Sequence, residues 1–255
     1  MATFFRFSYQ DEAGYGLLLE PGVGEKITGS PLTGFQRTNQ QFTLSEITFL
    51  PPCQPTKIVC LGLNYRDHAQ EFDSALPDEP LIFMKPPSAL IGHLDKIVCP
   101  TMSQRVDYEA ELAVVIGKTC HKVSEAQAMD YVLGVSCLND VTARDLQQKD
   151  GQWCRAKGFD TFCPTGPYLV TNIDPRDLAV QSFLNGELRQ SSRTSRLIFP
   201  IPFLIQHISR VMTLYPGDII STGTPSGVGP MKPGDRVEIR IEQVGQLINT
   251  VIQGD

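Results

Sequence analysis

The sequence predicts a β-rich α+β fold with few helices. Most of its apolar segments are short, as expected for strands rather than helices. Turn-forming residues separate them, including Asn185-Gly186 and the Pro-Gly-Asp triplets at 216–218 and 233–235. Helical patterns are confined to a few places. The following segments justify this fold class in chain order.

The first 50 residues form a small β-rich segment in this interpretation. Strands are expected at 3–10 and 15–20, followed by connections rich in Gly, Pro and Thr. The prolines at 51, 52 and 55 indicate a boundary, so the main domain is expected to span residues 51–255.

Strands dominate the predicted main domain. Helical character at 66–75 ends early because of Pro77 and Pro80. A helix is expected at 124–132, which Ser124 can cap, and another at 202–214 with apolar residues 203, 204, 208, 211 and 212 on one stripe. The expected strands are 57–65, 109–117, 131–140, 166–171, 179–190 (a hairpin), 218–225 and 235–253.

Composition and charge exclude several classes of protein. The formal net charge is −6 and no Lys/Arg cluster occurs, so neither nucleic acid nor an anionic membrane is an expected partner. No segment approaches the ~20 apolar residues that span a bilayer. The seven cysteines include no CxxC pair, and their number is odd, which favours reduced cysteines in a cytoplasmic protein.

Two acidic residues precede a buried-type strand. Glu109 and Glu111 are two residues apart, so on a strand they point to the same face with Cα atoms about 6.6 Å apart. Two such carboxylates repel each other unless a cation offsets them, and Mg²⁺ and Mn²⁺ prefer oxygen ligands. The alternative is a solvent-facing strand edge that carries two acids.

Asp140 ends the apolar segment that begins at residue 131. A carboxylate at the tip of a buried strand commonly faces a site rather than bulk water. Three carboxylates, with water and a ligand completing the shell, suit Mg²⁺. The alternative is a turn formed by the Asn-Asp pair.

His68 and Glu71 are spaced i, i+3, which makes them neighbours on a helical turn. A carboxylate beside an imidazole orients it and raises its basicity, as a general base requires. An exposed helix pair is the alternative.

Two further segments carry candidate groups. Lys157 lies beside Gly158 and between aromatic residues, where it can pair with a substrate carboxylate or a developing enolate, unless it is a solvated surface lysine. The Gly-rich segment 222–229 has backbone N–H groups that can bind an anion. It has no GK[ST], and no GxSxG occurs in the chain, so neither a Walker site nor a serine hydrolase elbow is expected.

In this order, the segments resemble the fumarylacetoacetate hydrolase family over roughly residues 56–250. Each motif is modest, but the ordered set is specific. Within the family, the chain is similar to the small acylpyruvases and oxaloacetate decarboxylases. The motifs are LNYRDHAQE, IFMKPPSALIG, DYEAELAVVIG, LNDVTARDLQ, RAKGFDTFCPTGP, NGELRQ and GDIISTGTPSGVGP.

The resemblance implies a mixed β-sheet roll, a homodimer and one Mg²⁺ or Mn²⁺. It assigns the metal to Glu109, Glu111 and Asp140, and a catalytic dyad to His68 and Glu71.

The resemblance also implies roles for residues outside the metal ligands. Lys157 matches an active-site lysine, and Arg144, Gln147 and Thr224 match positions that contact the substrate's carboxylate and oxo groups. The turn at 92–94 departs from the family's usual Gly-Pro-Gly-Asp-like sequence, which we expect to alter a loop and not the chemistry.

The expected activity is C–C bond hydrolysis of acylpyruvates, decarboxylation of oxaloacetate, or both, on a small 2-oxo acid that chelates the metal. One alternative is an isomerase or decarboxylase of hydroxymuconate-type diacids, which uses the same metal. A second is a non-catalytic protein that binds a metabolite, which would need no His68–Glu71 pair.

Overall fold

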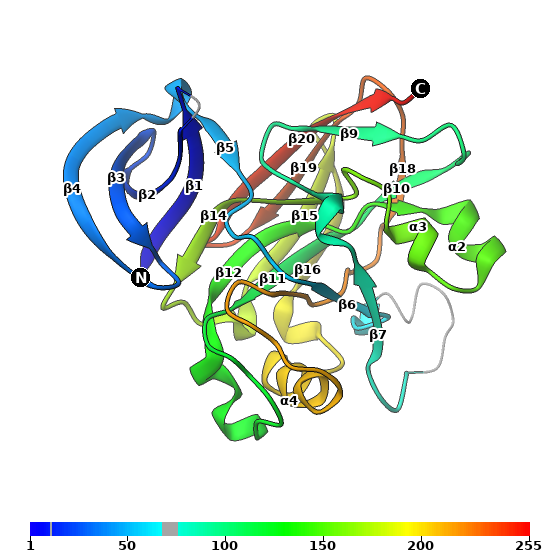
Figure 1. Cartoon of the computed structure of the whole chain (residues 1–255). Helices are drawn as coiled ribbons and strands as arrows, with labels where there is room; N and C mark the ends of the chain where they lie inside the picture. Colours follow the sequence, from blue (N-terminus) through cyan, green and yellow to red (C-terminus); the bar gives the residue numbers. More distant parts are fainter. Residues whose placement is uncertain (11, 68–75) are drawn as a thin grey trace.

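The computed structural model describes residues 1–10, 12–67 and 76–255. In this part of the chain, strands form three sheets of twelve, five and three strands, with a few short helices beside them (Figure 1). The predicted β-rich α+β class is confirmed. Among the described residues, no helix is long and apolar enough to cross a membrane.

The largest sheet runs through both the N-terminal segment and the main domain. Its order is β4-β3-β2-β1-β14-β12-β11-β17-β6-β7, with β5 paired to β1 and β8 paired to β14. The bounds are β1 Ala2–Tyr9, β2 Glu12–Glu20, β3 Val23–Ser30, β4 Gly34–Thr43, β5 Thr48–Leu50, β6 Ile58–Gly62, β7 Leu81–Lys85, β8 Leu90–Ile91, β11 Ala110–Ile116, β12 Val132–Asn139, β14 Cys163–Thr171 and β17 Ile219–Ser221.

This sheet curls back on itself as a roll. Strand β7 is at its far edge, yet β8, which follows β7 in the chain, pairs with β14 near the middle of the sheet. The curl brings the end of β7 across from the end of β12. Strands β6, β11 and β12 are buried almost throughout, as their continuous apolar composition requires.

Two smaller sheets complete the fold. The five-stranded sheet has the order β16-β15-β19-β20-β9 and packs on β11, β12 and β14, while the three-stranded sheet has the order β13-β10-β18. The bounds are β9 Lys96–Cys99, β10 Val106–Tyr108, β13 Thr142–Ala143, β15 Ala179–Leu184, β16 Glu187–Arg193, β18 Gly229–Met231, β19 Arg236–Ile241 and β20 Gly245–Gln253.

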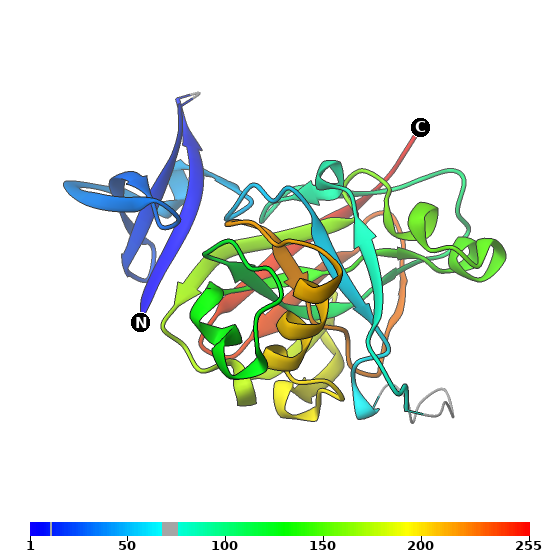
Figure 2. The ribbon, with the colours of Figure 1, turned by 60° about the horizontal axis from the view of Figure 1, so that its bottom comes forward.

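The helices are short and lie outside the sheets. Helices α2 and α3 adjoin the three-stranded sheet, and α4 packs beside η3 (Figures 1 and 2). The bounds are α2 Arg144–Asp150, α3 Cys154–Lys157, α4 Ile201–Val211, and, for the 3-10 turns, η1 Leu44–Glu46, η2 Pro87–Ala89, η3 Glu125–Tyr131, η4 Pro175–Asp177 and η5 Thr194–Arg196.

Both predicted helices exist, but with differences. The segment after Ser124 is a 3-10 turn, and the Ser124 hydroxyl bonds the Gln127 side chain instead of capping a backbone N–H. In α4 the buried stripe includes Leu204 and Ile208 as predicted, whereas Val211 is exposed because it ends the helix beyond its packed turn.

The predicted Gly/Pro/Thr-rich connections after residue 20 are wrong, because the segment forms strands β3 and β4. Strand β4 is polar and mostly exposed, so it has no apolar alternation that would indicate a strand. Pairing with β3 holds it in place. The predicted turns are confirmed: Asn185 and Gly186 have positive φ between β15 and β16, and Gly217 and Gly234 have positive φ before β17 and β19.

Candidate metal centre

Three carboxylates converge where the sheets meet. Glu111 is on β11, Asp140 directly follows β12, and Glu109 lies between β10 and β11, where the chain passes from the three-stranded sheet to the large sheet. Their oxygen atoms lie within 4.8 Å of one another, and all three side chains are buried. The carboxylates therefore face each other and not solvent, unlike the alternative of an acidic strand edge.

The backbone holds these acids in place. Strand β12 is antiparallel to β11, so the end of one adjoins the start of the other. The Asp140 N–H donates to the Glu109 carbonyl at 2.9 Å, and the Glu109 N–H donates to Oδ1 of Asn139 at 2.9 Å. The convergence is therefore a product of strand register.

Two buried lysines accompany the acids. Lys157, at the end of α3, donates to Glu109 Oε2 at 2.8 Å and to Asp140 Oδ2 at 2.6 Å. Lys85, at the end of β7, donates to Asp140 Oδ1 at 2.5 Å and to the Val141 carbonyl at 2.9 Å. Sequence reasoning assigned no role to Lys85. Its signal was a single charge that ends the apolar run LIFM before two prolines.

Arg144 and Gln147 border the cluster on α2. Arg144 Nη2 bonds Glu109 Oε1, Nη1 donates to Gln147 Oε1 at 2.6 Å, and Nε donates to Asp107 Oδ2 at 2.9 Å. Asp107 is fully buried and also accepts from Arg105, so it holds the guanidinium of Arg144 from behind. The structure thus brings the predicted pair Arg144 and Gln147 together beside Glu109.

Glu111 has neutral partners. Its Oε2 accepts from the Ser221 hydroxyl at 2.5 Å and from the Gly223 N–H at 2.7 Å. The Gly-rich segment thus binds an anion, as its free N–H groups suggested, but that anion is a carboxylate of the protein. Thr224, predicted to contact substrate, donates its hydroxyl to the Ala110 carbonyl at 3.0 Å and accepts from Gln190 at 2.8 Å.

The surroundings of the two glutamates shift their pKa values in opposite directions. Burial alone would raise the pKa of Glu109, but the charges of Lys157 and Arg144 outweigh it and hold that pKa far below its usual range. Burial, together with the negative charges of Asp140 and Glu109, holds the pKa of Glu111 well above its usual range. The cluster is therefore short of positive charge beside Glu111. Buried carboxylate oxygens with this deficit fit a hard divalent cation.

The predicted dyad His68 and Glu71 lies outside the described residues. Its neighbour Asp67 accepts from Ser192 at 2.5 Å and from Arg196 at 3.0 Å, which fixes the chain immediately before the dyad.

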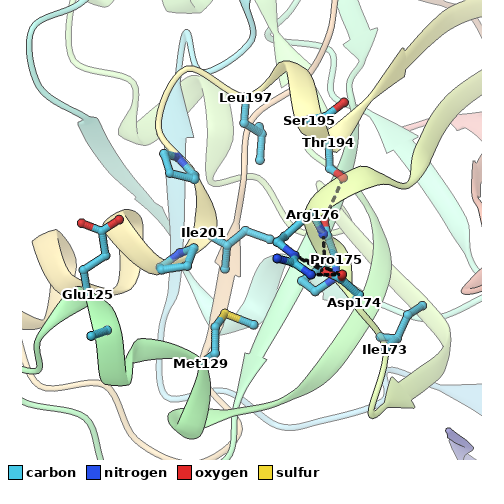
Figure 3. Close-up of a pocket in the computed structure, with 13 residues that line it drawn as sticks. Glu125, Met129, Ile173, Asp174, Pro175, Arg176, Thr194, Ser195, Leu197 and Ile201 are labelled. Atoms are coloured by element: carbon cyan, nitrogen blue, oxygen red, sulfur yellow. Dashed lines mark hydrogen bonds and ion pairs between the residues drawn. The ribbon is translucent and has the colours of Figure 1, made fainter.

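A groove lies elsewhere, between η3, η4, η5 and the start of α4 (Figure 3). It encloses about 630 Å³ and shares no residue with the acid cluster. Its lining is mostly apolar, and two of its three charged residues, Asp174 and Arg176, pair with each other at 2.6 Å, while the third is Glu125. Because the lining residues of this groove include no group of converging acids, we assign the chemistry to the acid cluster and not to this groove.

Comparison with known proteins identifies the chain. The profile described as fumarylacetoacetate (FAA) hydrolase C-terminal matches residues 57–252. The chain belongs to the fumarylacetoacetate hydrolase family. The resemblance carried by the sequence motifs is thereby confirmed. A second profile, described as Rv2993c-like, N-terminal, matches residues 3–52.

Relatives within the fumarylacetoacetate hydrolase family have different names. An uncharacterized protein of Archaeoglobus fulgidus is 56% identical over 212 residues, which cover 83% of this chain and 85% of the relative. A mitochondrial oxaloacetate tautomerase of Bos taurus is 48% identical over 221 residues, 82% of this chain and 70% of the relative.

Solved structures of the family share the fold. A 2-hydroxyhepta-2,4-diene-1,7-dioate isomerase from Mycobacterium marinum has a TM-score of 0.93 at 41% identity and covers 99% of both chains. Maleylpyruvate hydrolase from Sphingobium sp. SYK-6, solved with manganese(II) and pyruvate, has a TM-score of 0.83 at 34% identity and covers 100% of both. This chain is thus similar to enzymes named for tautomerisation, isomerisation and hydrolysis.

Proposed function

We propose that the chain is a Mg²⁺- or Mn²⁺-dependent enzyme acting on small 2-oxo acids with a second carbonyl or carboxylate in β relation, oxaloacetate first. One observation carries the proposal: three buried carboxylates with oxygens within 4.8 Å of one another, accompanied by buried Lys85 and Lys157. Ion pairs that only stabilise the fold would not require a third buried acid such as Glu111, whose pKa is raised. A perturbed pKa of this kind is typical of a functional site.

The cation would be held by Glu109, Glu111 and Asp140. When bound, it supplies Lewis-acid polarisation of a chelated 2-oxo acid. The three ligands come from rigid strand ends, which suits a preorganised site.

The chain's own cations would serve the substrate. Burial opposes the charge of Lys157, but Asp140 and Glu109 outweigh it and raise the pKa of Lys157, so its ammonium persists. That charge offsets the negative charge developing on the 2-oxo oxygen. Arg144, backed by Asp107, offers a planar guanidinium suited to a substrate carboxylate.

Both reactions of oxaloacetate place an enolate at C2 and C3: the enolate of pyruvate in decarboxylation and the enolate of oxaloacetate in tautomerisation. In decarboxylation, the electron pair of the bond to the leaving carboxylate moves toward the 2-oxo group, CO₂ departs, and C3 gains a proton. In keto-to-enol tautomerisation, C3 loses a proton, the 2-oxo oxygen gains one, and no C–C bond breaks. The relatives named oxaloacetate tautomerase support the second outcome.

C–C hydrolysis of acylpyruvates is the second candidate. It needs a base that takes a proton from water, and the His68–Glu71 pair provides one in the sequence. The water would attack the distal carbonyl, and the electron pair of the broken C–C bond would pass to the pyruvate fragment. The similarity to maleylpyruvate hydrolase supports this candidate.

The test is a substrate panel. Oxaloacetate, in keto and enol forms, and acetylpyruvate are supplied with Mg²⁺, with Mn²⁺ and after chelation, and NMR identifies the products. We expect turnover of at least one substrate only with metal. His68→Ala should reduce acetylpyruvate hydrolysis more than oxaloacetate decarboxylation. Equal turnover without metal would refute the proposal.

The same panel separates the remaining alternatives. A hydroxymuconate-type diacid that isomerises faster than oxaloacetate reacts would favour the isomerase function, which the Mycobacterium marinum neighbour's name supports. Consumption of no β-dicarbonyl acid would favour a metabolite-binding protein.

We further propose that the chain acts as a homodimer in the cytoplasm. All seven cysteines are unpaired and six of them are buried, which suits a reducing compartment. Light scattering at low protein concentration tests the dimer, and a monomer would contradict it.

A further inference from the structure

Tyr65 carries a buried hydroxyl without a partner. Its side chain has 0% exposure, and its Oη has no hydrogen-bond partner among residues 1–10, 12–67 and 76–255. Buried polar groups are nearly always bonded, so an orphan indicates a group that bonds something else when the protein works.

The backbone places Asn64, the residue before Tyr65, against the segment that binds Glu111. Asn64 packs so tightly on Gly223 that a Cβ on Gly223 would lie 2.8 Å from the Asn64 Cβ. Gly223 is the residue whose N–H donates to Glu111 at 2.7 Å. On its other side, Tyr65 forms a β-bridge with Leu197.

The chain around Tyr65 is held firmly. The Asn64 side chain donates to the Thr222 carbonyl at 2.7 Å and accepts from the Phe199 N–H at 2.9 Å. The Asn64 carbonyl accepts from the Ile198 N–H at 2.8 Å. The backbone at Tyr65 is therefore held by neighbours on both sides.

We propose that Tyr65 is a binding residue whose hydroxyl donates to an oxygen ligand held beside Glu111. The ligand is an oxygen of a water on the bound cation or of the 2-oxo acid. This inference rests on the proposed metal-dependent function and adds a donor that the carboxylates cannot provide. The sequence offered no signal for it, since an aromatic residue after a strand is usually core.

The electrostatics suit a donor. Burial, and then the charges of Glu111 and Asp67, raise the pKa of the Tyr65 phenol, so it keeps its proton. A hydrogen bond from the phenol to an anionic or polarised oxygen would be charge-assisted and hence strong.

The variant Tyr65→Phe tests the proposal because it removes only the hydroxyl oxygen. Tyr168→Phe is the matched control. Tyr168 packs against Phe49 in the N-terminal segment. Calorimetry measures Mn²⁺ binding to the metal-free protein and oxalate binding to the Mn²⁺-loaded protein, and thermal unfolding is followed without metal.

We expect Tyr65→Phe to weaken Mn²⁺ binding, oxalate binding or both by about tenfold, with no fall in the metal-free unfolding temperature. Weaker Mn²⁺ binding would show that the Tyr65 hydroxyl bonds a water on the cation. Weaker oxalate binding with unchanged Mn²⁺ binding would show that it bonds the organic ligand. The control should change neither.

Two results would overturn the inference while the proposed function stands: wild-type affinities in both arms, or a lowered metal-free unfolding temperature, which would reveal a structural partner. A wild-type protein that binds no Mn²⁺ would remove the proposed function and this inference together.

Discussion

The ammonium nitrogen of Lys157 lies 2.6 Å from Oδ2 of Asp140, and both side chains are almost wholly buried. The same nitrogen reaches Glu109 at 2.8 Å, so one lysine joins two of the three candidate metal ligands. An ion pair this deep leaves a costly charge behind when either partner is removed. The cluster's stability and its chemistry therefore depend on the same charges.

Lys157→Met keeps an unbranched side chain that is one atom shorter and removes its charge. We expect the metal-free variant to lose about 3–5 kcal/mol of unfolding free energy, because Glu109 and Asp140 lose their shared cation. Mn²⁺ should raise the unfolding temperature of the variant more than that of the wild type, since it supplies the missing charge. Turnover should fall at least about 100-fold.

Arg155→Met is the control for that variant. Arg155 is also on α3, but it is exposed and pairs with Asp150 at the surface. Denaturation and thermal shifts with and without Mn²⁺ make the comparison. A Lys157 variant as stable as this control would contradict the central role of the buried pair.

Glu109→Gln and Asp140→Asn test the metal ligands while keeping side-chain volume. We expect each to weaken Mn²⁺ binding at least about 100-fold, because changes one shell further out already cost 10–100-fold. Asp150→Asn, at an exposed ion pair, should bind Mn²⁺ like the wild type. Calorimetry with the metal-free proteins decides, and unchanged affinity in both variants would refute the assigned site.

The surroundings of His93 predict that the stability of the fold depends on pH. Its Nδ1 accepts from the Ile248 N–H at 3.1 Å, a bond that a protonated ring cannot accept. Burial and then the charge of Arg236 lower the pKa of His93 to about 4. The unfolded chain, with a histidine pKa of about 6.5, binds the proton more readily. This stability is therefore present above about pH 6.5 and is lost as pH falls toward 4.

His93→Asn keeps an acceptor and removes the titration. Between about pH 6.5 and pH 5 we expect the unfolding free energy of the wild type to fall by of the order of 1 kcal/mol more than that of this variant. The full pKa shift would give a larger value, but His93 is partly exposed and solvent screens its interactions. The exposed His121 gives the control, His121→Asn. Parallel pH profiles for wild type and His93→Asn would disprove the assignment.

Two glycines distinguish the cost of a steric clash from the cost of an unfavourable backbone conformation. A Cβ at Gly134, in β12, would lie 2.4 Å from the Val170 carbonyl oxygen, whereas one at Gly186 would meet nothing within 4 Å. Gly186 instead has a φ of +86°. We expect Gly134→Ala to cost about 3 kcal/mol and Gly186→Ala about 1 kcal/mol in urea denaturation. The reverse order would contradict the described pairing of β12 with β14.

The sequence predicted strands where apolar composition is strong, as in β6, β11 and β12, and turns where Asn-Gly or Pro-Gly-Asp occurs. It failed at β4, whose polar residues gain their conformation from pairing with β3. It also placed Glu109 on one strand with Glu111, whereas the strand breaks between them. Pairing partners are distant in the chain, so local pattern cannot report them.

The sequence by itself determined the residue types of the site and the family. The motifs and their order can be read without knowing which residues are in contact. Only the tertiary structure decided that Lys85 reaches Asp140 and that Asn64 packs on Gly223, whose N–H donates to Glu111. The reason is the curl of the large sheet, which β8 closes onto β14. Whether a buried charge has a partner depends on how the sheet curls. The curl depends on strand pairs that are distant in the chain.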